Sequence, residues 1–214
     1  PLRSSNKPPN HIQTVMECLF GISGSDFCIL AADTTVARSI VKMKTKGECK
    51  FRHLTPNAVM AYSGEPGDAS RFADHVAAAM RLELVKGEGR DLGIDRVSAW
   101  TRKTLCDALR SRTPYNVNVL IGGCDGNTKS GTLYWMDYLG SLVKVPFGAH
   151  GYGAYFCMGL LDKEWRVGMS EEEAMTLLRK CLNDLKTRFI VALPEFAVRI
   201  IRSDGTIEES ILVV

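Results

Sequence analysis

Apolar residues in the first third of the chain occur in short runs, each about as long as a β-strand. Residues that favour turns separate these runs, among them Gly24-Ser25-Asp26 and Thr55-Pro56-Asn57, and the second of these is typical of a β-hairpin. The pattern predicts four strands, over 15–23, 27–33, 40–44 and 58–63.

The spacing of the apolar positions then changes from that of a strand to that of a helix. It predicts a helix with Asp68 as its N-cap, closed by Gly87 and Gly89. A second helix is predicted from an N-cap at Asp95 to a stop before Pro114.

The second half of the chain again has strand patterns followed by helix patterns. Ser170 and Glu173 have the spacing of a capping box, which marks the start of one helix. The predicted elements, in chain order, are strands over 116–122, 132–138 and 142–145, a helix over 154–164, a helix from Ser170, and a final hairpin of strands over 196–202 and 206–213.

This order of elements predicts an α+β fold. Strands and helices come in blocks and do not alternate singly, which argues against a parallel, doubly wound sheet. Hairpin-linked strands form antiparallel sheets, and two such sheets bury their apolar faces against each other and against helices. We therefore predict a four-layer α-β-β-α sandwich, with an N-terminal extension over 1–14 and a single domain over 15–214.

Composition and charge exclude several classes of protein. The 214 residues carry a formal net charge of only +3, with 45% hydrophobic and 24% charged residues, as in an ordinary globular protein. Lys42, Lys44 and Lys46 alternate along one strand and are interpreted as a solvated strand face, not as a nucleic-acid patch. No apolar run approaches the length of a bilayer span, and the first residues lack a signal-peptide core.

The cysteine pattern indicates reduced thiols. The seven cysteines are odd in number, are scattered, and form no C-x-x-C pair. This favours a cytosolic or nuclear protein over a disulfide framework or a zinc site.

Two stretches are candidates for chemistry. The apolar run FCILAAD ends abruptly on Asp33, whose carboxylate either takes part in catalysis or accepts backbone N–H groups in the following turn. The glycine-rich 148–153 lacks the lysine and spacing of a phosphate loop and is interpreted as a tight connection from strand to helix. His150 within it is a weak candidate for a general base, because no matching nucleophile and acid are identifiable nearby.

The layer order and several longer stretches resemble the N-terminal nucleophile hydrolases, and within them the β subunits of the 20S proteasome, in particular their β type-2 branch. The resemblance covers about residues 15–212. The stretches that carry it are FCILAAD, LRSRTPYNVNVLIGG, LYWMDYLGSLVKVPFGAHGYGA, LLRKCLNDLKTRFI and FAVRII.

The resemblance implies where catalytic groups would stand. In active members a threonine freed by self-cleavage after a glycine is the nucleophile and its own α-amino group is the base. Asp33 stands on the position of the aspartate that supports this group. Met16 and Glu17 stand where the threonine is expected, and the nearest threonine, Thr14, follows Gln13 and not glycine.

The other positions implied by the resemblance also lack the expected side chains. By ungapped count Cys49 stands at the place of the catalytic lysine, with Lys50 one residue away and expected on the opposite face. Phe189 and Ala192 stand at the places of a supporting aspartate and serine, and Gly151 at that of a second serine.

These replacements predict a non-catalytic subunit, with no catalytic, cofactor-binding or metal-binding residue. Cys18 and Ser23 are rival nucleophiles, since other superfamily members use cysteine or serine, but each needs cleavage directly before it. The alternative is an active threonine hydrolase after self-cleavage; a second rival is a monomeric binding module of the same fold.

The resemblance also implies partners and a location. The branch holds the fourth position of the eukaryotic β ring, which implies neighbours at the third and fifth positions, an α ring on one side and the second β ring on the other. The expected locations are the cytoplasm and nucleus. The seam with the chymotrypsin-like neighbour is a possible small-molecule inhibitor site.

Overall fold

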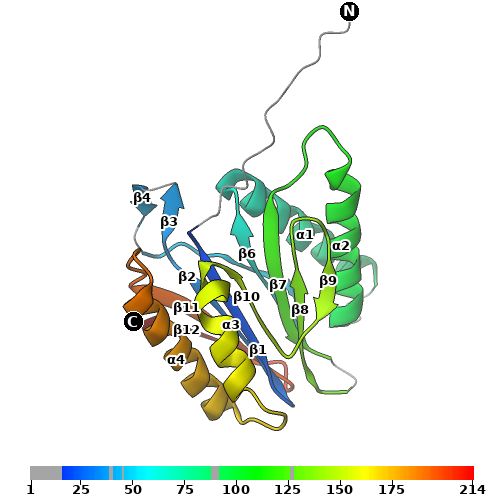
Figure 1. The fold of residues 1–214 in the computed structure, drawn as a ribbon. Helices are drawn as coiled ribbons and strands as arrows, with labels where there is room; N and C mark the ends of the chain where they lie inside the picture. Colours follow the sequence, from blue (N-terminus) through cyan, green and yellow to red (C-terminus); the bar gives the residue numbers. More distant parts are fainter. Residues whose placement is uncertain (1–15, 39–40, 45, 88–91, 126–127) are drawn as a thin grey trace, which may run out of the picture.

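A computed structural model describes residues 16–38, 41–44, 46–87, 92–125 and 128–214, so the predicted N-terminal extension and Gly89 lie outside the described residues (Figure 1). No helix within these residues is long and apolar enough to span a membrane.

Two five-stranded antiparallel sheets form the centre of the molecule. The first has the order β10-β1-β2-β11-β12, with strands β1 (Cys18–Ser23), β2 (Phe27–Asp33), β10 (Phe147–Gly151), β11 (Glu195–Arg202) and β12 (Ile207–Val213). The second has the order β5-β6-β7-β8-β9, with strands β5 (Phe51–Thr55), β6 (Ala58–Gly64), β7 (Val117–Cys124), β8 (Gly131–Met136) and β9 (Leu142–Lys144). A separate two-stranded sheet pairs β3 (Val36–Arg38) with β4 (Val41–Lys44).

Each five-stranded sheet is covered by a pair of helices on its outer face (Figure 1). The pair α3 (Tyr152–Glu164) and α4 (Glu171–Arg188) packs on the first sheet, and the pair α1 (Pro66–Lys86) and α2 (Ile94–Leu109) packs on the second. A third apolar cluster fills the space between the two sheets. The predicted four-layer α-β-β-α sandwich is confirmed.

Strand β2 explains the uninterrupted apolar run before Asp33. All seven of its residues are buried. Ile29 and Ala31 pack in the cluster beneath α3 and α4, while Cys28, Leu30 and Ala32 pack between the sheets. A strand with both faces covered cannot alternate apolar and polar residues, and this run therefore marks the middle of the sandwich.

The predicted helix N-termini were right in only one of three cases. The capping box is confirmed, because the Glu173 amide donates to Ser170 Oγ at 3.2 Å and the Ser170 amide donates to Glu173 Oε2 at 3.0 Å. Asp68 and Asp95 are not N-caps: they lie inside the first turns of α1 and α2, after N-caps at Glu65 and Gly93.

The glycine-rich stretch leads directly from a strand into a helix, as predicted, since α3 begins at Tyr152, but it also contains a strand that was not predicted. Residues 147–151 form β10, which pairs with β1 and places Gly151 opposite Cys18. Gly151 has φ +69°, and a Cβ there would lie 1.8 Å from the Glu17 carbonyl oxygen, so this close approach of two backbones requires glycine. The sequence pattern missed β10 because glycine and alanine give no polar alternation.

Of the three alternating lysines, Lys44 and Lys46 are exposed and Lys42 is partly buried, and each binds its own chain. Lys42 Nζ donates to the Ala192 carbonyl, Lys44 pairs with Glu48 at 3.2 Å, and Lys46 pairs with Glu195 at 2.8 Å. The nucleic-acid interpretation gains nothing from these contacts, because the carboxylates already offset two of the charges.

Candidate functional site

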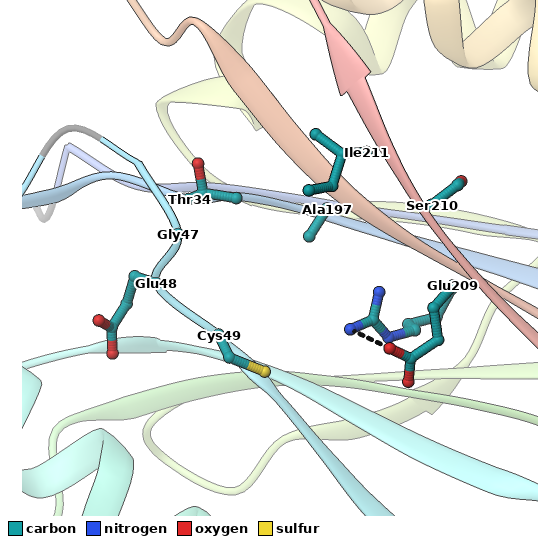
Figure 2. A pocket seen from close by; sticks show the side chains of 9 residues that line it. Thr34, Gly47, Glu48, Cys49, Ala197, Glu209, Ser210 and Ile211 are labelled. Carbon is teal, nitrogen blue, oxygen red and sulfur yellow. Dashed lines mark ion pairs between the residues drawn. The ribbon is translucent and has the colours of Figure 1, made fainter.

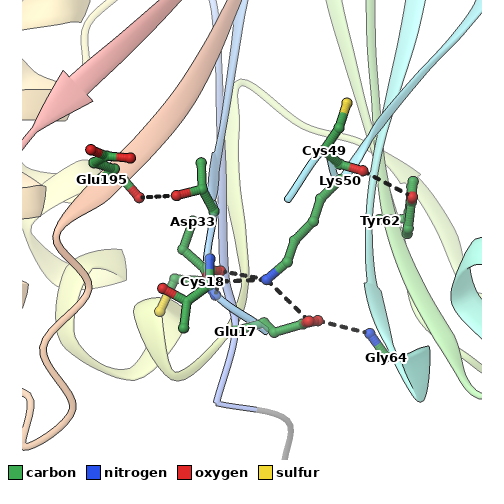
Figure 3. A network of polar contacts seen from close by, with 10 residues as sticks. Glu17, Cys18, Asp33, Cys49, Lys50, Tyr62, Gly64 and Glu195 are labelled. Carbon is green, nitrogen blue, oxygen red and sulfur yellow. Dashed lines mark hydrogen bonds and ion pairs between the residues drawn. The ribbon is translucent and has the colours of Figure 1, made fainter. Parts of the chain in front are cut away.

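Three ionisable side chains meet where the two sheets face each other (Figure 3). Asp33 is the last residue of β2, Lys50 directly precedes β5, and Glu17 directly precedes β1. Their exposed fractions are only 6% for Glu17, 1% for Asp33 and 3% for Lys50. We call these three residues the buried cluster.

Asp33 answers the question of why an apolar strand ends in an acid. Its Oδ1 accepts from the Cys18 amide at 2.8 Å and its Oδ2 accepts from the Thr35 amide at 3.2 Å. Lys50 Nζ lies 3.0 Å from each of the two oxygens. The carboxylate therefore satisfies backbone donors where β1 starts and β2 ends, as the structural interpretation predicted, and it also has a cation.

The prediction for Lys50 was wrong. Its side chain does not point away from Asp33; the ammonium group reaches Asp33 and also lies 3.0 Å from Glu17 Oε1. The alternation of side chains holds, since Cys49 is exposed and Lys50 is buried. The ungapped count was off by one residue, so it placed the exposed cysteine at the lysine position.

Glu17 is the residue whose role the sequence did not reveal. Its Oε2 accepts from the amide of Gly64, the last residue of β6, at 3.1 Å, while Oε1 contacts Lys50. The side chain thus joins the start of β1 in the first sheet to two points on the second. The sequence signal was a glutamate directly before an apolar strand, at a position expected near Asp33. Two acids placed close together suggest repulsion and not a shared cation.

The electrostatics of the buried cluster follow from burial and mutual pairing. Burial alone would lower the pKa of Lys50, but the Asp33 and Glu17 carboxyl groups outweigh it and raise that pKa. Burial raises the pKa of Glu17, Lys50 opposes this shift, and the charge of Asp33 adds to it. Lys50 is therefore a firmly held ammonium group and not a free base.

The rival nucleophiles do not have the environment of reactive groups. The Cys18 thiol is fully buried, and its pKa is raised mainly by burial and secondly by the charge of Asp33, which disfavours the thiolate. Ser23 is at the far end of β1, where its Oγ donates to the Pro146 carbonyl at 2.9 Å.

The other positions named by the resemblance carry no polar side chain to the buried cluster. The Phe189 ring packs against the rings of Tyr152 and Phe156, with centroids 5.2 and 5.9 Å away. Ala192 contributes its carbonyl oxygen to Lys42, and Gly151 lies against the Glu17 backbone.

His150 lies in β10 as a buried structural residue. Its Nε2 is 3.1 Å from the Val119 carbonyl, and its ring stacks on Trp135 with centroids 4.7 Å apart. Burial lowers the pKa of His150 to about 4, so the ring is neutral at pH 7. None of its contacts involves a member of the buried cluster.

A cavity of ≈280 Å³ lies beside the segment 47–49 and does not contain the buried cluster (Figure 2). Its walls come from β11, β12, this segment and the residue that follows β2, and its lining residues are Thr34, Gly47, Glu48, Cys49, Ala197, Arg199, Glu209, Ser210 and Ile211. An Arg199–Glu209 ion pair at 2.9 Å crosses one wall. Within the described part of the chain, no group of three or more His, Cys, Asp or Glu side chains is arranged to hold a metal ion.

Comparison with known proteins gives a consistent result. The family described as "Proteasome subunit" matches residues 16–201. A Neurospora crassa protein named "Probable proteasome subunit beta type-4" is 39% identical over 90% of this chain and 94% of its own length. "Proteasome subunit beta type-4" of Saccharomyces cerevisiae is 38% identical over 89% of this chain and 95% of its own, and "Proteasome subunit beta type-2-B" of Arabidopsis thaliana is 39% identical over 90% and 95%.

Proposed function

The chain belongs to the proteasome subunit family as a β-type subunit, and from this premise we propose that it is a non-catalytic subunit of the 20S core particle. Its function is then to build the β ring and to support protein degradation by neighbouring catalytic subunits, in the cytoplasm and the nucleus.

One observation carries this proposal. The carboxyl group beside Lys50 and Asp33 belongs to Glu17, whose side chain has no hydroxyl group to act as a nucleophile. A catalytic threonine needs its hydroxyl group at this place. Because Lys50 and Asp33 are present, the proposal no longer depends on a missing lysine; it depends on the nucleophile and on the replacements at Gly151, Phe189 and Ala192.

Burial supports the same proposal. Each member of the buried cluster is at most 6% exposed, so its charged atoms are not accessible to a peptide substrate in this chain. The neighbouring cavity is lined by Cys49 and not by Lys50, so it does not lead to the ammonium group. The contacts are those of a satisfied structural network.

A covalent inhibitor tests the proposal directly. Purified core particles containing this chain are incubated with a threonine-directed covalent inhibitor, digested, and analysed by mass spectrometry. We expect labelled N-terminal peptides from the catalytic neighbours, which serve as the positive control, and no label on the peptide covering residues 13–23. A labelled peptide from 13–23 would support the active hydrolase instead, and so would an intact mass showing cleavage before a threonine, serine or cysteine in that stretch.

The proposed partners are the subunits at the third and fifth ring positions, the α ring and the opposite β ring. A closed ring requires two lateral contacts of each subunit, and stable contacts bury about 1,200–2,000 Å² each. We therefore expect the isolated chain to form partial assemblies or to be poorly soluble. A monomer at micromolar concentration that binds no other β subunit in sedimentation experiments would favour an independent binding module.

We also propose that the seam with the chymotrypsin-like neighbour at the fifth position can hold a small-molecule inhibitor. Concave sites are common where two packed units meet, and a ligand there can brace or distort the neighbour's cleft without touching a catalytic residue. Selection of variants resistant to non-covalent inhibitors tests this. Resistance changes are expected in both subunits, whereas changes confined to the catalytic neighbour across many chemotypes would count against the seam.

A further inference from the structure

The buried cluster has an unequal charge count. It contains two carboxyl groups, Glu17 and Asp33, and one ammonium group, Lys50. If all three were ionised, one excess negative charge would lie where the exposed fractions are 6%, 1% and 3%. An excess charge removed from water is costly, and a buried acid usually avoids this cost by keeping its proton.

Hydrogen-bond counting shows that Asp33 has no place for that proton. Its Oδ1 faces the Cys18 amide and Lys50 Nζ, and its Oδ2 faces the Thr35 amide and Lys50 Nζ. A carboxylate offers about four lone-pair positions, two on each oxygen. All are directed at N–H donors, so a proton on Asp33 would oppose one of them.

Glu17, unlike Asp33, has lone-pair positions that can accept a proton. Among the residues that the structure describes, its Oε1 has one close contact, to Lys50, and its Oε2 has one, from the Gly64 amide. One lone-pair position on each oxygen is therefore not used by these contacts. The two acids share one lysine, but only Glu17 can accept a proton without losing a hydrogen bond.

We propose that Glu17 keeps its proton in the folded chain under conditions in which an exposed glutamate is ionised. The buried cluster is then a pH-sensitive interaction that holds the two sheets together. In the protonated state it consists of a Lys50–Asp33 ion pair and a neutral acid that still binds the Gly64 amide. In the deprotonated state it holds a net negative charge between the first and second sheets.

The groups that act on Glu17 agree with this assignment. Burial raises the pKa of Glu17, and the Asp33 charge from β2 raises it further, against the opposing effect of Lys50 from the segment before β5. The adjacent Cys18 thiol in β1 stays neutral, because burial raises its pKa. A folded-state pKa above the unfolded value contributes stability at low pH, and this contribution is lost as the pH rises through the folded-state pKa.

The direct test follows the carboxyl carbon of Glu17 by NMR in core particles assembled with copies of this chain labelled with 13C-glutamate. The Glu17→Gln variant identifies the resonance by its disappearance. We expect this resonance to titrate at higher pH than the resonances of exposed glutamates. A Glu17 resonance that titrates together with the exposed glutamates would overturn the proposal.

A matched pair of variants provides a second measurement in the assembled particle. Glu17→Gln and Asp33→Asn make the same chemical change at the two acids that share Lys50. In cells that co-express tagged variant and wild-type chains, we expect Glu17→Gln to enter core particles within twofold of wild type and Asp33→Asn to be depleted at least tenfold. Glu17→Ala, which loses the Gly64 bond, should also be depleted. Equal depletion of Glu17→Gln and Asp33→Asn would mean that Glu17 is an ionised partner of Lys50.

Discussion

Two clusters of this molecule have the same balance of charged groups but opposite surroundings. Each holds one cation between two carboxyl groups. In the buried cluster, Lys50 lies 3.0 Å from both Glu17 and Asp33, and the three side chains are at most 8% exposed. On the surface, Arg202 lies 2.5 Å from Glu171 and 2.7 Å from Glu208, and these side chains are 30–53% exposed.

The difference teaches that access to water, not the number of charges, decides what such a cluster does. Water solvates the excess charge of the surface cluster, so its two carboxylates need no further partners. The buried cluster has no such solvent and instead receives the Cys18, Thr35 and Gly64 amides. In this proteasome-family subunit, the arrangement therefore fixes the start of β1 and the ends of β2 and β6.

The largest expected effect comes from removing each cation in turn. Lys50→Met leaves the Asp33 carboxylate buried without its ammonium partner, and we expect the free energy of unfolding to fall by about 3–5 kcal/mol. Arg202→Met, the matched change on the surface, should cost no more than about 1 kcal/mol. Urea denaturation of both full-length variants measures the two losses. Similar losses would break the contrast between the clusters.

Histidines provide a second buried and exposed pair. The pKa of His150 is lowered to about 4 by burial, against an ordinary value of 6.5, so its contribution to stability is complete above pH 6.5 and is lost as the pH falls towards 4. The size of this loss is roughly 3 kcal/mol. His53 is half-exposed beside Glu209 and serves as the exposed histidine for comparison.

Unfolding measurements between pH 7.5 and 4 test this pair. His150→Phe keeps a ring on Trp135 and loses the bond to Val119, so it should be less stable at pH 7 but should show a flatter decline below pH 6.5. His53→Gln is the control and should follow the wild type. An acid slope that His53→Gln flattens and His150→Phe leaves intact would reverse the assignment.

Two glycines sharpen the comparison at the level of the backbone. Gly151 and Gly168 both have positive φ, +69° and +80°, but a Cβ on Gly168 meets nothing within 4 Å, whereas a Cβ on Gly151 would meet the Glu17 carbonyl oxygen. Both alanine variants bear the cost of a positive φ, and only Gly151→Ala adds crowding against the Glu17 backbone. We expect Gly151→Ala to be less stable than Gly168→Ala by about 1–3 kcal/mol. Thermal unfolding of the two variants gives the difference. Equal stabilities would show that the backbones of β1 and β10 can move apart at little cost to accept the added Cβ.

The sequence predicted the layers of the fold better than the ends of its elements. The apolar run of β2 and the helical spacing of apolar residues in α1 each extend over a whole element, because each element packs against the core along its length. Both elements were predicted. The first turn of a helix has no such pattern: Asp68 and Asp95 have the chemistry of N-caps but lie within the first turns of α1 and α2. Strand β10 was missed because its inward residues are small and its glycines resemble those of a loop.

The candidate site could be predicted only in part, because its key contacts depend on register. Asp33 was identified from its place at the end of an apolar strand. Lys50 was assigned to the wrong face because a one-residue error in the count exchanges the two faces of an extended segment. Glu17 was seen as a charge near Asp33, but its bonds to Lys50 and Gly64 join segments that are 33 and 47 residues away in the sequence. No local pattern encodes such pairings.

The smallest expected effect distinguishes the two clusters by their response to salt. Mobile ions reach exposed charges, and the Debye length falls from about 30 Å at 0.01 M to about 3 Å at 1 M ionic strength. The coupling between Arg202 and Glu171, measured by a double-mutant cycle with Arg202→Met and Glu171→Gln, should therefore fall from about 0.5–1 kcal/mol at low salt towards zero at high salt. The same cycle on Lys50 and Asp33 should be nearly independent of salt, because ions do not enter a site whose side chains are at most 4% exposed. If the Lys50–Asp33 coupling also fell with salt, water and ions would have to reach the buried cluster, and the proposal that Glu17 is a neutral, buried acid would lose its physical basis.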